Sequence, residues 1–270
     1  PIMDGFAKYL SSDLPVLQIT WARYFFTIVF TFPLMFFFFK KYLVWTDKPK
    51  LQLIRGLILL TANISFFYSI SVISLPKALT LAFVAPLVVT AFSPFFLGES
   101  VGYRRWAAVI IGFIGSLVVI RPGFLEINLA SLAALGTGIM YGFYLIITRK
   151  LSTSDNPLLT LLLTGVVGAI IATTFMPFVW VSPTFNQWSI MAAIGLFACI
   201  GHLFIILSLK YADASKLAPF SYFEIVTNII IAYYFFGDFP DSWTFLGLFI
   251  IVFSGIYISR RENIVKNIKI

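Results

Sequence analysis

The stretch LAPFSYFEIVTNIIIAYYFF, residues 217–236, decides the fold class, because it runs for twenty residues with a single charge, Glu224. A helix needs about 20 predominantly apolar residues to cross the hydrocarbon core of a bilayer. A lone carboxylate near the centre of such a helix costs about 2.5–3.5 kcal/mol on insertion scales. The stretch therefore predicts a transmembrane helix whose carboxylate has a function.

The composition of the whole chain supports a membrane protein. Of its 270 residues, 60% are hydrophobic and 11% are charged, whereas soluble domains carry about 25% charged residues. The net charge is +8, but the basic residues fall in short gaps between apolar runs, which is typical of cytoplasmic loops and not of a nucleic-acid surface. One cysteine, Cys199, and one histidine, His202, exclude a disulfide framework and the multi-ligand metal motifs. We expect no cofactor, no metal and no nucleic-acid partner.

Apolar runs predict ten spanning helices, the first of them truncated. The nine others are expected near 16–39, 53–74, 78–97, 106–120, 128–148, 157–180, 188–209, 214–236 and 242–259. The run at 106–120 is short, so its flanking Arg105 and Arg121 are expected to snorkel. PIMDGFAKYL, residues 1–10, is half a span, and we expect about ten further apolar residues before it in the natural protein.

Loop charges orient these helices. With both termini on one side, that side receives fifteen Lys and Arg, including Arg55, whereas the other receives only Lys8, Lys77 and Arg121. Arg23 lies inside a predicted span. The positive-inside rule then predicts that both termini are cytoplasmic.

The chain also contains an internal repeat. AKYLSSDLPVLQ at 7–18 resembles TRKLSTSDNPLLT at 148–160, and FFLGESV at 95–101 matches YFFGDFP at 234–240. Each half holds five predicted helices, and because five is odd, the second half enters the membrane from the opposite side. We expect two inverted five-helix repeats, 1–123 and 124–270, with substrate bound between them as in secondary transporters.

Four segments resemble the EamA group of the drug/metabolite transporter superfamily: ITWARYFF at 19–26, RGLILLTANISFFYSISVISLPKALTLAFVAPL at 55–87, FFLGE at 95–99 and ADASKLAPFSYFEIV at 212–226. The resemblance implies ten helices, a bacterial inner-membrane location and transport without ATP. From APFSYFE to FGDFPD, residues 218–241, the chain is most similar to the S-adenosylmethionine uptake carriers of that group. Members of the group carry many different solutes, so the resemblance leaves the substrate open.

Polar and aromatic residues on the predicted spans suggest a polar cavity walled with tyrosines. The candidate substrate or coupling residues are Glu224, Arg23, Asp4, Tyr24, Asn63, Tyr68, Tyr141, Tyr144, Tyr222 and Asn228, with His202 and Trp21 as secondary candidates. Two alternatives stay open: threonines and serines on these faces are also explained by helix packing, and a lone histidine is often a satisfied core residue.

Depth in the membrane relates the charged candidates to one another. Arg23 and Asp4 each lie about six residues from the outer ends of their helices, hence about 9 Å deep, so they are candidates for an ion pair. Glu224 lies about 15 Å from either end of its predicted helix. Three roles are open for the Glu224 carboxylate: it binds a cationic solute, it carries a coupled proton, or Arg23 neutralises it. Pro86 and Pro219 are expected to interrupt their helices.

Together these features predict a secondary transporter that works by alternating access. An acid within aromatic walls favours a solute with an amine, sulfonium or other cationic centre, and S-adenosylmethionine is the first candidate. Export of amino acids or other metabolites is the alternative. The expected partners are the solute and the lipid bilayer. A coupling proton and a second copy of the chain, in a homodimer, are further candidates.

Other classes of protein fit less well. A membrane enzyme needs a nucleophile with a base or a metal cluster, and neither HExxH nor GxSxG occurs in the chain. A receptor or scaffold needs no inverted repeat. Tyrosines dispersed around one acid differ from the selectivity ring of a channel.

Overall fold

The computed structural model describes residues 1–38, 46–98, 101–121, 128–152, 154–211 and 223–268, and every regular element in these ranges is a helix. In chain order the helices are α1 (Ile2–Leu10), α2 (Val16–Phe38), α3 (Pro49–Val72), α4 (Leu75–Ala82), α5 (Ala85–Leu97), α6 (Tyr103–Ile120), α7 (Leu129–Leu151), α8 (Pro157–Val179), α9 (Phe185–Tyr211), α11 (Phe223–Phe236) and α12 (Ser242–Ile268). Among the described residues, eight helical stretches are long and apolar enough to cross a membrane, with α4 and α5 forming one of them. The predicted all-α membrane class is confirmed.

The other two predicted spans correspond to shorter helices. Helix α1 has nine residues, and α11 has fourteen and begins at Phe223. Residues 212–222, including Pro219 and Tyr222, lie outside the described part of the chain. The short span expected at 106–120 begins earlier, at Tyr103, and α6 reaches eighteen residues because Arg104 and Arg105 belong to its first turn.

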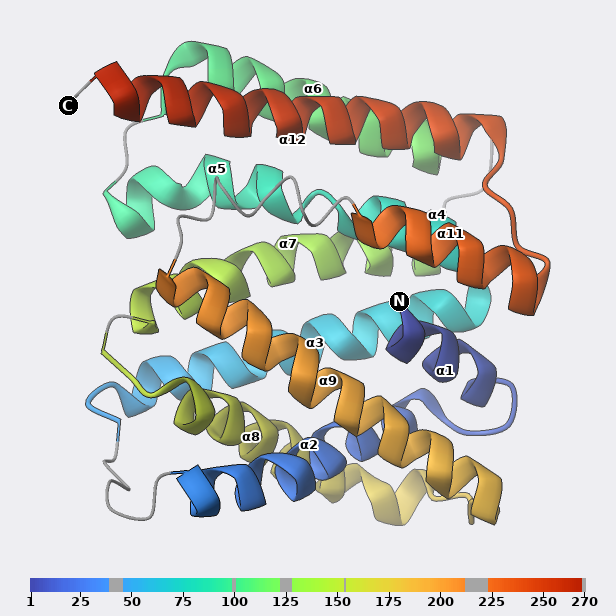
Figure 1. The fold of residues 1–270 in the computed structure, drawn as a ribbon. Helices are drawn as coiled ribbons and strands as arrows, with labels where there is room; N and C mark the ends of the chain where they lie inside the picture. The colour runs from blue at the N-terminus through green and yellow to red at the C-terminus, as the bar shows by residue number, and fades with distance from the viewer. Residues whose placement is uncertain (39–45, 99–100, 122–127, 153, 212–222, 269–270) are drawn as a thin grey trace.

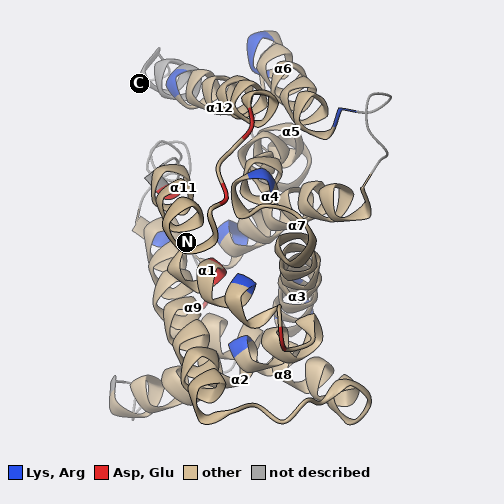
Figure 2. Cartoon of the chain, turned by 90° about the vertical axis from the view of Figure 1, so that its right-hand side faces the viewer, with Lys and Arg blue, Asp and Glu red and all other residues tan. Residues whose placement is uncertain are grey.

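Helices that follow one another along the chain alternate in direction (Figure 1). Helices α2, α5, α7, α9 and α12 end at the left of the view, and α1, α3, α6, α8 and α11 end at the right. Most of the helical ribbon carries neither basic nor acidic residues (Figure 2). The same view places α1 inside the bundle, where it packs against α9 and α11.

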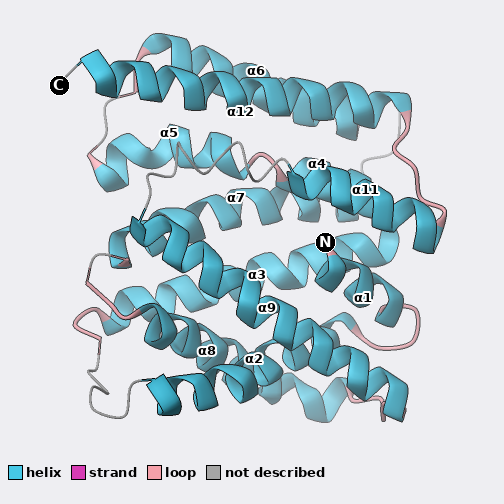
Figure 3. Ribbon diagram, viewed as in Figure 1, coloured by secondary structure: helices cyan, strands magenta, loops and turns pink. Residues whose placement is uncertain are grey.

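Helices in equivalent positions of the two predicted repeats pack against each other. Helix α2 packs on α8, and α6 packs on α12 in an outer layer of their own (Figure 3). The α6–α12 crossing is close because glycines face each other: a Cβ added at Gly247 would lie 2.6 Å from the carbonyl oxygen of Gly115. Small residues allow this approach of two backbones in a membrane bundle.

The helix expected at 78–97 is broken in its middle, as Pro86 predicts. Helix α4 ends at Ala82, and α5 begins at Ala85 with Pro86 in its first turn. Proline has no N–H to continue the ladder of hydrogen bonds. The break lies against α7 at Gly138, where an added Cβ would lie 2.6 Å from the carbonyl oxygen of Ala82. Broken helices of this kind are typical of the binding region of secondary transporters.

Candidate functional site

Two arginines lie entirely inside the helical bundle. Arg23 on α2 has 2% of its surface exposed, and Arg55 on α3 has none. A guanidinium stays charged under all ordinary conditions, and a buried charge is costly unless partners stabilise it. The partners of these two side chains therefore define the chemistry of the protein interior.

Arg55 is held by neutral groups on α7 and α8. Its Nε donates to Thr148 Oγ1 at 2.8 Å, and its Nη2 donates to the Tyr144 hydroxyl at 2.8 Å. Its Nη1 donates to the Thr160 carbonyl oxygen at 3.2 Å and to Thr164 Oγ1. The guanidinium carbon also lies 4.5 Å from the centre of the Tyr144 ring. All three guanidinium nitrogens thus have partners, and these partners are uncharged.

The sequence counted Arg55 among the charges of the cytoplasmic side, near the start of the helix expected at 53–74, and did not predict that it is buried. Helix α3 begins at Pro49, so Arg55 lies about six residues inside it. The signal that reveals it is a polar face at helical spacing, because Gln52 and Arg55 are both buried and three positions apart. Gln52 Nε2 donates to Asp155 Oδ2 at 2.7 Å and to Thr160 Oγ1 at 3.0 Å, which extends this polar face toward the start of α8.

Arg23 lies beside the single histidine. Its Nη2 is 2.6 Å from His202 Nε2 on α9, and its guanidinium carbon is 4.7 Å from the centre of the Tyr24 ring. The Tyr24 hydroxyl is held by Asn63 Nδ2 at 2.8 Å. The Nε of Arg23 is buried and has no hydrogen-bond partner among the described residues.

The two arginines are joined through Tyr144 and His202. The hydroxyl of Tyr144 is 2.9 Å from His202 Nδ1 and accepts from Arg55. We name this set, Arg23, His202, Tyr144 and Arg55, the arginine network; it links α2, α9, α7 and α3. Three of its four members are predicted site residues, and Arg55 is the one that the sequence did not suggest.

The arginine network borders a small cavity. Its lining consists of Arg23, Tyr24, Thr27, Leu59, Tyr144, Leu161, Thr164, Gly165 and His202. Its volume of about 10 Å³ is room for roughly one water molecule. The described conformation is therefore closed around these polar groups.

Tyr141 relates the acidic candidates to the arginine network. The ring of Tyr141 stacks on that of Tyr144, with centroids 5.4 Å apart. Tyr141 is within electrostatic range of Glu224 and of Arg23, and Glu224 is within range of Asp4. Tyr141 thus interacts electrostatically with both a basic and an acidic candidate.

The expected ion pair between Asp4 and Arg23 does not form among the described residues. Arg23 contacts His202, and the side-chain ion pairs found among the described residues do not join Arg23 to Asp4. The reason is the packing of α1, which lies mainly against α9 and α11 and not against α2. Equal depth in the membrane did not bring the two helices together. Glu224 lies on α11 next to residues 212–222, so its expected mid-helix position falls partly outside the described residues.

The remaining candidates are dispersed. Asn228, one turn after Glu224, is fully buried, and neither its Nδ2 nor its Oδ1 has a partner among the described residues. Trp21 donates from Nε1 to Thr173 Oγ1 at 3.0 Å and contacts Trp180 and Trp188, so it belongs to an aromatic cluster of α2 with the α8–α9 region. Tyr68 is half-buried on α3. The arginine network does not include these three residues.

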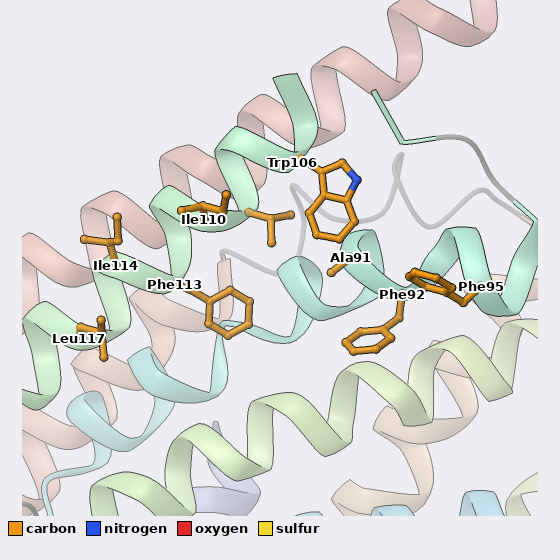
Figure 4. A pocket seen from close by; sticks show the side chains of 9 residues that line it. Ala91, Phe92, Phe95, Trp106, Ile110, Phe113, Ile114 and Leu117 are labelled. Atoms are coloured by element: carbon orange, nitrogen blue, oxygen red, sulfur yellow. The ribbon is translucent and has the colours of Figure 1, made fainter. Parts of the chain in front are cut away.

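A larger cavity on the bundle is apolar. It is a groove of about 440 Å³ between α5 and α6, and Figure 4 shows aromatic and aliphatic side chains along it. The lining residues are Ala91, Phe92, Phe95, Trp106, Val109, Ile110, Phe113, Ile114 and Leu117. Several of them are exposed on the outside of the bundle, where lipid tails are the expected neighbours. None of the candidate polar residues lines this groove.

Comparison with known proteins adds a family and several relatives. The EamA-like transporter family profile matches residues 2–121 and 128–260. An S-adenosylmethionine uptake transporter of Rickettsia bellii is 26% identical over 96% of this chain and 89% of its own length. A riboflavin transporter of Vibrio cholerae is 28% identical over 69% of this chain and 63% of its own length. A pseudopaline exporter of Pseudomonas aeruginosa is 24% identical over 97% of this chain and 92% of its own length.

A crystal structure of another protein aligns with the structure of this chain with a TM-score of 0.68, and the two sequences are 17% identical. The alignment covers 96% of this chain and 97% of that chain. At this identity the likeness establishes a shared fold only.

Proposed function

We propose, since this chain belongs to the EamA-like transporter family, that the small metabolite it transports is S-adenosylmethionine and that it imports this metabolite across the bacterial inner membrane. The observation that carries the proposal is the acidic region of Asp4 and Glu224 beside stacked aromatic rings. S-adenosylmethionine has a sulfonium, an α-amino group and an aromatic base. Carboxylates attract the first two, and the faces of tyrosine rings favour cations and flat rings.

Similarity to relatives supports the same solute. Four Rickettsia proteins described as S-adenosylmethionine uptake transporters match nearly the whole chain at 26–27% identity. The full-length match to a pseudopaline exporter favours the second candidate, which is export of amino acids or other metabolites.

For the transport cycle we propose alternating access between the halves 1–123 and 124–270. Contacts between the halves occur at both ends of the bundle. At one end Lys8 Nζ lies 2.7 Å from Asp238 Oδ2. At the other end Asp155 Oδ2 accepts from Thr46 at 2.5 Å and from Gln52 at 2.7 Å. Rocking of the halves would break one set of contacts while keeping the other, so the central site opens to one side at a time.

The charges of the loops support the proposed orientation. The end of the bundle at Lys48 and Asp155 is the one that the basic loops predict to be cytoplasmic, and the end at Lys8 and Asp238 is then the outer end.

Uptake by liposomes that contain the purified protein tests the proposal. We expect saturable uptake of radiolabelled S-adenosylmethionine that unlabelled S-adenosylmethionine suppresses. Liposomes with the variant Arg104→Gln serve as the matched control, because Arg104 is exposed at the start of α6 and donates a hydrogen bond to its neighbour Tyr103. Absence of uptake together with efflux of preloaded amino acids would favour the exporter.

A further inference from the structure

The arginine network has more hydrogen-bond donors than acceptors, and we infer that it is an anion subsite for the carboxylate of a zwitterionic substrate. This inference rests on the proposed function in so far as the chain transports a metabolite, but it does not require that metabolite to be S-adenosylmethionine. It extends the proposed site from its acidic region to a basic one.

The donor excess follows from the geometry at His202. Arginine can only donate, so His202 Nε2 accepts from Arg23 Nη2. The imidazole is then neutral and carries its proton on Nδ1, which donates to the Tyr144 oxygen. That oxygen also accepts from Arg55, so both of its lone pairs are used and its own proton is free to donate.

Arg23 supplies the second free donor. Its Nε–H is buried without a partner among the described residues, and it borders the small cavity together with Tyr144. An unsatisfied buried donor costs about 1–3 kcal/mol, and more when it is charged. A carboxylate with one oxygen toward Arg23 and the other toward Tyr144 satisfies both donors.

The charge balance points the same way. The side-chain ion pairs found among the described residues are Lys8 with Asp238 and Arg121 with Asp241, and neither includes Arg23 or Arg55. Two buried guanidinium charges without an acidic partner favour an anion that arrives from outside. Carboxylates suit this task because a hydrogen bond from a guanidinium to a carboxylate is charge-assisted, and the second carboxylate oxygen is left to accept from Tyr144.

The two arginines have different tasks at the subsite. All three nitrogens of Arg55 are bound to Thr148, Tyr144 and the α8 groups, so Arg55 is a positioning residue that orients Tyr144. Arg23 has a free Nε and a ring of Tyr24 beneath it, so Arg23 is the residue that touches the ligand.

The subsite also gives the substrate a direction. We place the carboxylate at Arg23 and Tyr144 and the cationic centre toward Glu224, because Tyr141 stacks on Tyr144 and is within electrostatic range of both Arg23 and Glu224. A cavity with room for about one water admits the carboxylate only after the surrounding helices separate on one side. An amine that lacks the carboxylate leaves the free donors of Arg23 and Tyr144 without an acceptor, so we expect it to be a poor ligand.

Matched pairs of compounds test this inference without depending on one substrate. Each pair is an amino acid and its decarboxylated amine: S-adenosylmethionine, L-methionine and L-lysine, each with the corresponding amine. Binding to the purified protein is measured by thermal shift as a function of concentration. For at least one pair we expect the amino acid to bind at least tenfold more tightly than the amine, equivalent to about 1.4 kcal/mol.

The variants separate the ligand-binding residue from the scaffold. Arg23→Gln should reduce the preference for the amino acid to less than threefold, and Arg23→Lys, which keeps the charge but not the fork, should retain part of it. Arg104→Gln should preserve the full preference. The comparison of wild-type affinities stands even if Arg23→Gln fails to fold.

Three results would overturn the anion subsite: equal affinity of acid and amine in every pair, no binding by any of the amino acids, or a preference that survives Arg23→Gln unchanged. Failure of S-adenosylmethionine uptake, combined with a carboxylate preference in the methionine or lysine pair, refutes the proposed substrate and leaves the subsite standing.

Discussion

Replacement of Arg55 by lysine and by methionine should separate the effect of its charge from the effect of its hydrogen bonds. Arg55→Lys keeps a buried charge but offers a single nitrogen to acceptors that now bind three. A lysine ammonium has three N–H donors, so at least one of the four hydrogen bonds of Arg55 is lost, and we expect a second loss because one atom cannot reach acceptors spread around a whole guanidinium. Because side-chain hydrogen bonds inside membrane bundles are worth about 0.6 kcal/mol on average and up to about 1.7 kcal/mol, the expected destabilisation is about 1–3 kcal/mol.

Arg55→Met removes the charge at similar length, and its cost should be smaller. The hydroxyls of Thr148 and Thr164 already donate to the carbonyl oxygens of Tyr144 and Thr160 on their own helices, at 2.6 and 2.8 Å. They lose an arginine donor but keep their own acceptors. The loss at Tyr144 is offset by relief from burying a charge that has no acidic partner. We expect Arg55→Met to destabilise the fold by less than Arg55→Lys.

Equilibrium unfolding in mixed detergent micelles measures the free energy of unfolding of both variants, with Arg104→Met at the exposed start of α6 as the control. The opposite order would refute the reasoning. If Arg55→Met were the more damaging by about 2 kcal/mol, Arg55 would have a carboxylate partner, since removing one member of a buried ion pair costs about 3–5 kcal/mol.

Three further predictions concern the transport site, the ends of the bundle and the topology. Glu224→Gln should insert and fold normally, while uptake of a cationic solute falls at least tenfold, equivalent to about 1.4 kcal/mol; wild-type uptake would mean that this side chain only braces helices. A cleavable cross-linker between Lys8→Cys and Asp238→Cys should stop transport, and cleavage should restore it, because that pair joins the proposed halves at one end; transport by the cross-linked protein would contradict the gate. Lys48→Cys and Asn186→Cys should react with an impermeant reagent from opposite sides of the membrane, and labelling of both from one side would refute the alternation of the helices.

Much of the fold was accessible from the sequence, and for a physical reason. In a bilayer each helix must satisfy its own backbone groups and match the thickness of the hydrocarbon core. The number and the length of the spans can therefore be predicted from local sequence, as apolar runs. One example is Pro157–Val179, which agrees with the predicted 157–180 to within one residue. The break at Pro86 is local for the same reason, because a single residue removes the hydrogen bond.

The partners of buried side chains are a different kind of information. A depth argument placed Arg23 level with Asp4, but depth describes one coordinate of a helix, and the partner depends on which helix lies opposite. That choice rests on close contacts between backbones, such as Gly195 of α9 against Phe26 of α2, where an added Cβ would lie 2.9 Å from a backbone carbon. This contact brings α9 beside α2, and His202 of α9 becomes the partner of Arg23.

Arg55 shows the same division. Its sequence neighbours place it at the edge of an apolar run, where an arginine ordinarily reaches water. Only the packing of α3 on α7 and α8 surrounds it with Tyr144, Thr148 and Thr164 and makes it part of a polar interior. Insertion of a segment into the membrane depends on the apolar content of that segment, so the spans can be predicted from the sequence. The polar contacts of the interior form where several helices meet, so they are known only from the tertiary structure.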